Sequence, residues 1–148
     1  MKNINLSYNK IKSIPIEFTY LLNLEKINLS NNQISNIHIE FENLTNVKDL
    51  DLSYNHIRKL KFNISKLNKL VILDLYKYKI EKIPNKIDKL IYLKTLNLSY
   101  NHIKKYNLKL NNLIDNGTFE YLGLINNLII NTLKIKRSRK TKVSLYLY

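Results

Sequence analysis

The sequence predicts a curved α/β solenoid, in which stacked repeats build a parallel sheet along the concave face. The stretch LDLSYNHI at residues 50–57 returns as LNLSYNHI at residues 96–103, with looser copies at 4–11 and 27–34. Neighbouring copies lie 23 residues apart, a period that is typical of stacked-repeat architectures. Each copy begins with an apolar–polar–apolar alternation, which is the pattern of a short strand with one buried face.

The repeats follow one another in phase, with expected boundaries at 1–23, 24–46, 47–69, 70–92 and 93–115. The pair Asn116-Gly117 then indicates a turn, because this dipeptide readily takes a positive φ. With three residues inserted there, a degenerate sixth repeat begins at about residue 119. We therefore expect a repeat domain over 1–133, followed by a basic C-terminal tail or end cap over 134–148.

The residues after each strand must return the chain to the start of the next strand. Their apolar positions have near-helical spacing, as at Ile83, Ile87 and Leu90, which predicts short helical or irregular segments on the convex face. Pro15 and Pro84 fit the irregular start of such a segment, where no backbone donor is needed.

An asparagine recurs where the chain leaves each strand and turns inward. A buried carboxamide there can donate to and accept from backbone groups of adjacent coils. Repeat four has Tyr78 at this position, and a phenol is larger and cannot donate two hydrogen bonds. We expect a local distortion or an outward swing at Tyr78. The expected structural ladder consists of Asn9, Asn32, Asn55, Asn101 and Asn127.

The repeated pattern L-x-x-L-x-L-x-x-N-x-I resembles that of the leucine-rich repeat family, over most of the chain. The segment Ile14-Pro15-Ile16-Glu17-Phe18 is similar to the I-P-x-x-[IF] segment of its 23-residue intracellular, Ras-suppressor-like subclass. The resemblance implies a binding module. The class includes scaffolds and adaptors, some binding small GTPases and some recruiting substrates to ubiquitin ligases.

The side chains between the apolar strand positions are expected to point out of the concave sheet and to be exposed. They form four columns: Asn3, Lys26, Asp49, Ile72, Thr95; Asn5, Asn28, Asp51, Asp74, Asn97; Ser7, Ser30, Ser53, Tyr76, Ser99; and Tyr8, Asn31, Tyr54, Lys77, Tyr100. Tyrosine supplies large contact area at low entropic cost and is enriched at binding hot spots. The expected partner-binding residues are Tyr8, Asn28, Asp49, Asp51, Tyr54, Asp74, Tyr76, Lys77, Asn97 and Tyr100.

Two alternatives stay open for these columns. The recurring Ser-Tyr-Asn is either a contact surface or a local solution favoured in an AT-rich genome. Asp49, Asp51 and Asp74 either accept a basic side chain of a partner or are balanced by Lys26 and Lys77 as a solvated surface.

The residues argue against an enzyme. The chain has no cysteine, so it has no thiolate nucleophile or thiolate metal site. His56 and His102 share a position two repeats apart, roughly 10 Å from each other, which is too far for one metal ion. The two glycines, Gly117 and Gly123, do not form a phosphate-binding loop. We expect no catalytic residue, no metal and no cofactor.

The formal net charge of +14 suggests acidic partners. Abundant Lys, Asn, Ile and Tyr, which have AT-rich codons, explain much of this charge by composition and favour a viral or protist source. Positive charge is more concentrated in the C-terminal tail. The tail forms either a nuclear-localisation signal or nucleic-acid patch, or a solvated basic segment. Its basic residues are Lys134, Lys136, Arg137, Arg139, Lys140 and Lys142.

No apolar run approaches the roughly 20 residues that span a bilayer, and residues 1–5 lack an apolar signal core. We expect an intracellular, cytoplasmic protein without membrane contact, with a nuclear location left open. The first coil would expose Ile4, Leu6, Ile11 and Ile14 at its edge. This predicts either self-association through open ends or a fragment of a longer reading frame.

The sequence thus favours a non-catalytic protein–protein interaction module that binds a partner on the concave face. The alternative is a basic nuclear or nucleic-acid-associated protein that acts through the C-terminal tail.

Overall fold

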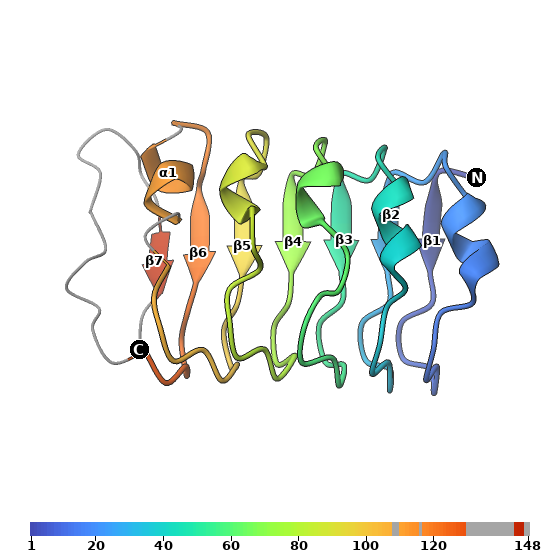
Figure 1. Cartoon of the computed structure of the whole chain (residues 1–148), viewed down its shortest axis with the longest axis horizontal. Coiled ribbons are helices and arrows are strands. Elements are labelled where there is room, and N and C mark those ends of the chain that lie inside the picture. The colour runs from blue at the N-terminus through green and yellow to red at the C-terminus, as the bar shows by residue number, and fades with distance from the viewer. Residues whose placement is uncertain (108–109, 116, 130–143, 147–148) are drawn as a thin grey trace.

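The computed structural model describes residues 1–107, 110–115, 117–129 and 144–146. Seven short strands lie side by side in chain order in one parallel sheet, as Figure 1 shows. They are β1 (Asn3–Asn5), β2 (Lys26–Asn28), β3 (Asp49–Asp51), β4 (Ile72–Asp74), β5 (Thr95–Asn97), β6 (Tyr121–Gly123) and β7 (Ser144–Tyr146).

The strand register repeats the sequence period. Ile27 pairs with Ile4 on one side and with Leu50 on the other, a step of 23 residues that continues to β5. The step from Leu96 to Leu122 is 26 residues. The longer repeat contains α1 (Leu110–Asp115) and Gly117, whose φ of 70° lies in the left-handed region that glycine tolerates.

Short helical segments cross the opposite side of the sheet and lie in front of it in Figure 1. We call this side the helical face, and the outer side of the strands the sheet face. Besides α1, the helical face carries the 3-10 helices η1 (Ile16–Tyr20), η2 (Ile39–Asn43), η3 (Ile64–Lys66) and η4 (Ile87–Lys89).

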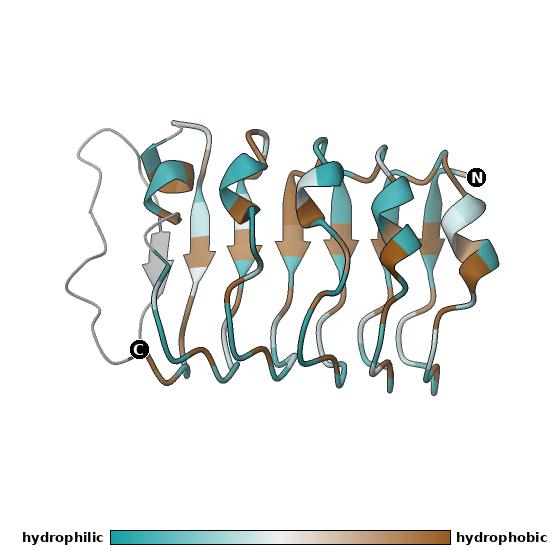
Figure 2. Cartoon of the chain, in the orientation of Figure 1, coloured by the Kyte–Doolittle hydropathy of each residue, from teal (hydrophilic) through white to brown (hydrophobic). Residues whose placement is uncertain are grey.

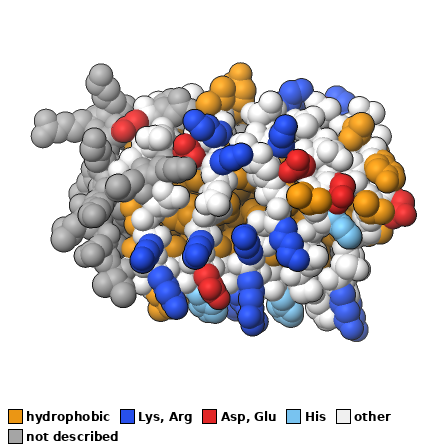
Figure 3. Space-filling model, viewed as in Figure 1, with side chains coloured by type: hydrophobic (Ala, Val, Ile, Leu, Met, Phe, Trp, Pro, Cys, Tyr) orange, Lys and Arg blue, Asp and Glu red, His pale blue; other side chains and the backbone are white. Residues whose placement is uncertain are grey.

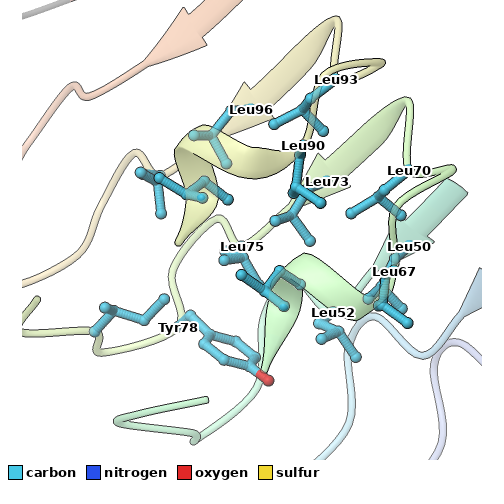
Figure 4. Packing of buried hydrophobic residues seen from close by; sticks show 14 of the residues in the cluster. Leu50, Leu52, Leu67, Leu70, Leu73, Leu75, Tyr78, Leu90, Leu93 and Leu96 are labelled. Atoms are coloured by element: carbon cyan, nitrogen blue, oxygen red, sulfur yellow. The ribbon is translucent and has the colours of Figure 1, made fainter. Parts of the chain in front are cut away.

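The core lies between these two faces. The central residue of each strand from β2 to β6 is buried and apolar, and Figure 2 shows these strand centres as hydrophobic. Leucines of successive coils stack in layers, as with Leu50, Leu73 and Leu96 in Figure 4. Such stacking buries the apolar face that a single repeat could not bury alone. The predicted α/β solenoid is confirmed.

The first coil is better covered than its sequence suggested. Ile4, Leu6 and Ile11 are half-buried and pack against the core, whereas Ile14 is buried. The expectation of an exposed Ile14 was therefore wrong. Ser13 forms a parallel bridge with Asn36, and this pairing holds the segment before η1 against the second coil.

Asparagine carboxamides join successive coils at the strand exits. Asn55 is representative: its Oδ1 accepts from Ile34 N at 2.9 Å, and its Nδ2 donates to the Leu29 carbonyl at 2.9 Å. Asn32, Asn101 and Asn127 make the equivalent pair of contacts with the coil before them. Asn9, in the first coil, is exposed and donates to carbonyls of its own coil.

This ladder is interrupted at Tyr78. The ring is fully buried, so the predicted outward swing was wrong; Figure 4 shows it among the leucines. Burying a large aromatic ring is favourable enough to draw it inward. The predicted local distortion is present, since Lys79 has a φ of 66°. In the third coil His56 N donates to the Ile34 carbonyl of the coil before it, but among the described residues Lys79 N makes no such bond. The Tyr78 hydroxyl is buried and has no hydrogen-bond partner among the described residues.

Candidate partner-binding site on the sheet face

The chain leaves each strand from β1 to β6 through a residue with a left-handed backbone. Six such residues have φ between 51° and 58°: Tyr8, Asn31, Tyr54, Lys77, Tyr100 and Asn126. This conformation is unfavourable for L-residues, with asparagine among the better tolerated. It was not anticipated from the sequence, although the asparagines in this column were a signal. Exposed fractions of 81% for Tyr8, 44% for Tyr54 and 45% for Tyr100 show that these rings stand on the surface.

Three tyrosines form a continuous row across β3 to β5. The Tyr54 and Tyr76 ring centroids are 5.0 Å apart, and those of Tyr76 and Tyr100 are 4.9 Å apart, with interplanar angles of 43° and 44°. Such offset, tilted pairs are favourable aromatic contacts. Tyr76 completes the row because it replaces the serine of the first, second, third and fifth repeats. Tyr8 is outside this tyrosine row, since the second repeat has Asn31 at the intervening position.

A lysine adds positive charge to one end of the tyrosine row. The Nζ of Lys77 lies 5.4 Å from the centroid of the Tyr54 ring, within the range of a cation–π contact. Loss of hydration raises the pKa of Tyr76 to about 12, with further contributions from the neighbouring phenols of Tyr54 and Tyr100. The central phenol of the row therefore stays protonated and uncharged at physiological pH.

Three carboxylates lie beside the row on neighbouring strands. Asp74 is held in place, because its Oδ1 accepts from Tyr76 N at 2.8 Å and its Oδ2 accepts from Asn97 Nδ2 at 3.2 Å. Asp51 accepts from Ser53 N at 2.9 Å. Burial raises the pKa of Asp74 and that of Asp49, and the proximity of Asp51 raises both further. We call Asp49, Asp51 and Asp74 the acidic cluster.

Within the described residues, the acidic cluster makes no ion pair, since the three ion pairs found there join Lys2 and Lys48 to Glu25, and Lys94 to Glu120. Lys77 lies over the Tyr54 ring. Lys26 acts on Asp49 through its field, which lowers the pKa of that carboxyl against the effect of burial.

The serine column differs from the sequence expectation. Ser30, Ser53 and Ser99 are buried rather than exposed. Each donates its backbone N–H to the side-chain oxygen two residues earlier, and the Ser30 hydroxyl also donates to Asn28 Oδ1 at 2.8 Å. At Ser30 the second bond turns the hydroxyl back onto the strand. The neighbouring longer side chains, such as Asp51, then form the accessible surface.

The sheet face is close-packed at β6. An ideal Cβ on Gly123 would lie 2.7 Å from both Asn97 Oδ1 and Ser99 Oγ, so glycine leaves room for these side chains. The part of the chain that the structure describes contains no group of histidines and carboxylates arranged to hold a metal ion. The site thus offers aromatic faces, fixed carboxylates and amides. The predicted basic tail, from Lys134 to Lys142, lies outside the described residues.

Comparison with known proteins agrees with this architecture. A family model described as leucine rich repeat matches residues 1–57. A leucine-rich-repeat protein of Leptospira interrogans superposes with a TM-score of 0.75 at 26% identity, over 99% of this chain and 43% of that one. An internalin of Listeria monocytogenes gives a TM-score of 0.72 at 28% identity, over 86% of this chain and 35% of that one. The fold is thus a leucine-rich-repeat solenoid, and the matches support a relationship to the leucine-rich repeat family.

A plant structure shares the fold at lower identity. It is the ectodomain of the membrane receptor kinase GASSHO1/SCHENGEN3 from Arabidopsis thaliana, in complex with CASPARIAN STRIP INTEGRITY FACTOR 2. The TM-score is 0.77 at 21% identity, over 98% of this chain and 19% of that one. The chain therefore spans less than half the length of each of these three structures. No curated protein sequence matches the chain.

No helix within the described ranges is long and apolar enough to cross a lipid bilayer.

Proposed function

We propose that the chain is a non-catalytic protein-interaction module that binds a protein partner through the sheet face. The observation that carries the proposal is the tyrosine row, whose outer rings, Tyr54 and Tyr100, stay 44% and 45% exposed while contacting Tyr76. Rings that are already packed against one another lose little conformational freedom on binding, and tyrosine is a frequent hot-spot residue.

The acidic cluster gives this surface a chemical preference. Two of its carboxyls, Asp51 and Asp74, occupy facing positions of β3 and β4, and Asp49 lies on the same side of β3. A lysine or arginine of the partner would find carboxylates that form no ion pair with any described residue, beside aromatic faces that attract cations. The partner segment is therefore expected to present at least one basic side chain near the tyrosine row.

The test replaces the outer rings. In Tyr54→Asn/Tyr100→Asn, asparagine tolerates the left-handed backbone at both positions, so a loss of binding reports the rings and not a strained turn. The matched control is Tyr20→Asn/Tyr92→Asn, which removes two exposed rings outside the strand columns. In affinity capture with mass spectrometry, a specific partner should be lost by the first variant and retained by the second. Equal recovery by both variants and the wild type would refute the proposal.

The same experiment distinguishes binding by the sheet face from the alternative, in which the basic tail binds nucleic acid. A variant lacking residues 134–142 should still capture the partner if the sheet face is the binding surface. Steep weakening with salt, together with loss on tail deletion, would instead favour nucleic-acid binding.

We also propose the 23-residue Ras-suppressor-like subclass and an intracellular, cytoplasmic location. The uniform step of 23 residues from β1 to β5 supports the subclass. A profile built from that subclass alone should score the chain above profiles of other leucine-rich repeats. A tagged chain that is absent from the cytoplasm would contradict the location.

A further inference from the structure

A groove crosses the helical face between the third and fourth coils. Its volume is about 820 Å³, within the size range of ligand-binding clefts. The walls come from residues 58–63, which lead into η3, and residues 80–86, which lead into η4, with Ile39 and Glu42 of η2 at one end. It lies on the opposite side of the sheet from the tyrosine row.

The groove has an apolar floor and a basic rim. Phe62, Ile80 and Ile83 are buried beneath it, whereas Leu60 is half-buried and Ile39 is exposed at its end. Figure 3 shows hydrophobic side chains in the middle of the helical face, with lysine and arginine side chains on both sides of them. Five cations line the groove: Arg58, Lys59, Lys61, Lys82 and Lys86.

The cations around this groove are not neutralised. The lining contains two carboxylates, Glu42 and Glu81, and Glu42 already accepts from Asn63 N at 3.0 Å. None of the five cations takes part in an ion pair among the described residues. Five cations against two carboxylates leave the groove with a positive excess, which favours an anionic occupant.

A uniform compositional bias does not explain this charge. The segment 58–63 carries three of the five cations, yet the equivalent residues 35–40 of the second repeat contain no lysine or arginine. Both segments belong to one chain and one codon usage. The concentration of charge therefore varies from coil to coil, since residues 104–109 of the fifth repeat also carry three lysines.

The backbone is also irregular at this groove. The two coils that form its walls are the ones whose asparagine ladder is interrupted by Tyr78. Lys79 and Lys86 have φ values of 66° and 63°, and neither lies in the strand-exit column where positive φ recurs. Among the described residues, the coils on the two sides of the groove are thus joined by fewer hydrogen bonds than the second and third coils or the fourth and fifth coils.

We propose that this groove is a second docking surface, which binds an acidic peptide segment of a partner protein with apolar side chains between its carboxylates. Carboxylates would pair with the basic rim while apolar side chains cover the half-buried Leu60 and the exposed Ile39 at the end of the groove. Nucleic acid fits less well, because the one ring in the lining, Phe62, is buried and offers no platform for base stacking.

The test uses the full chain as bait for a displayed library of random peptides. Enriched peptides are then made synthetically and titrated by fluorescence anisotropy. Arg58→Glu/Lys82→Glu changes one exposed cation on each wall. The control, Lys10→Glu/Lys12→Glu, makes the same change of net charge at exposed sites of the first repeat, outside the groove.

The expected result is enrichment of peptides that combine Asp or Glu with apolar residues. Their affinity should fall about tenfold or more in the groove variant and stay within about twofold in the control, as for loss of close charge pairs. Tyr54→Asn/Tyr100→Asn should bind these peptides normally, which separates this inference from the proposed function of the sheet face.

Several outcomes would overturn the inference. They are no enrichment, enrichment of peptides without acidic residues, and equal loss in the groove variant and the control. Equally tight binding of a polyglutamate peptide would reduce the groove to a non-specific charge effect. Tighter binding of a single-stranded oligonucleotide, lost in the groove variant, would assign the surface to nucleic acid instead. Thermal unfolding of each variant confirms that the chain is folded.

Discussion

Removing one buried oxygen should make this protein more stable. The hydroxyl of Tyr78 is buried with no hydrogen-bond partner in the part of the chain that the structure describes, and burial raises the pKa of this phenol well above its usual value. An unpaired buried polar group costs about 1–3 kcal/mol relative to a paired or hydrated one. Tyr78→Phe keeps the ring in the core and removes this cost. We expect the free energy of unfolding to rise by about 1–2 kcal/mol, or about 2–6 °C in the melting temperature.

The matched control has the opposite sign. Tyr106 is half-buried, and its hydroxyl donates to Asn111 Oδ1 at 2.8 Å. Tyr106→Phe removes the same atom but breaks a hydrogen bond, so it should lower the free energy of unfolding by about 0.5–1.5 kcal/mol. Urea unfolding followed by circular dichroism measures both variants. A destabilised Tyr78→Phe would show that the hydroxyl is satisfied and that the account of the interrupted ladder is wrong.

Two further predictions concern other polar contacts. Asn101→Ala should lower the free energy of unfolding by about 2–4 kcal/mol, because the buried carboxamide hydrogen-bonds backbone groups of two coils. Asn9 is exposed, so Asn9→Ala should change the free energy of unfolding by less than about 0.5 kcal/mol. The midpoints of urea unfolding compare the two variants. Hydrogen bonds from Lys2 and Lys48 lower the pKa of Glu25 to about 2, from an ordinary value of 4.5. Because the folded pKa is depressed, this contribution is fully present above pH 4.5 and is lost as pH falls towards 2. In Glu25→Gln, the free energy of unfolding should therefore fall less steeply as the pH drops from 4.5 towards 2. The same pH dependence as the wild type in this window would contradict the assignment.

The repeated positions could be predicted from the sequence because each is specified several times. A single Leu-x-Leu is weak, but five copies in phase determine the strand register and the inward direction of Leu50 and its equivalents. The same logic located the asparagines that join the coils. Repetition thus supplies, within one chain, the redundancy that makes a periodic fold recognisable.

The features that escaped prediction depend on single departures from the repeat. Periodicity places Tyr76 at the serine position of the repeat and Tyr78 at the asparagine position. It does not predict whether each ring contacts neighbouring rings or enters the core. The alternation of strand residues marks Ser53 as outward, yet Ser53 is buried in the structure, where its backbone N–H donates to Asp51 Oδ1. The groove was missed for the same reason, because it forms where the fourth coil differs from its neighbours.

The interrupted ladder has a consequence for how the solenoid unfolds. When each repeat contacts its neighbours in sequence, stability is a sum of intrinsic terms and nearest-neighbour coupling terms. The coupling between the third and fourth coils lacks contacts that the other coil pairs have, so this boundary is the natural site of a break in cooperativity. The contact between the Tyr54 and Tyr76 rings spans that boundary on one side, and the basic groove spans it on the other. A ligand bound across this boundary on either face would therefore strengthen the weak coupling between the third and fourth coils. The repeats on the two sides of the boundary would then unfold more cooperatively.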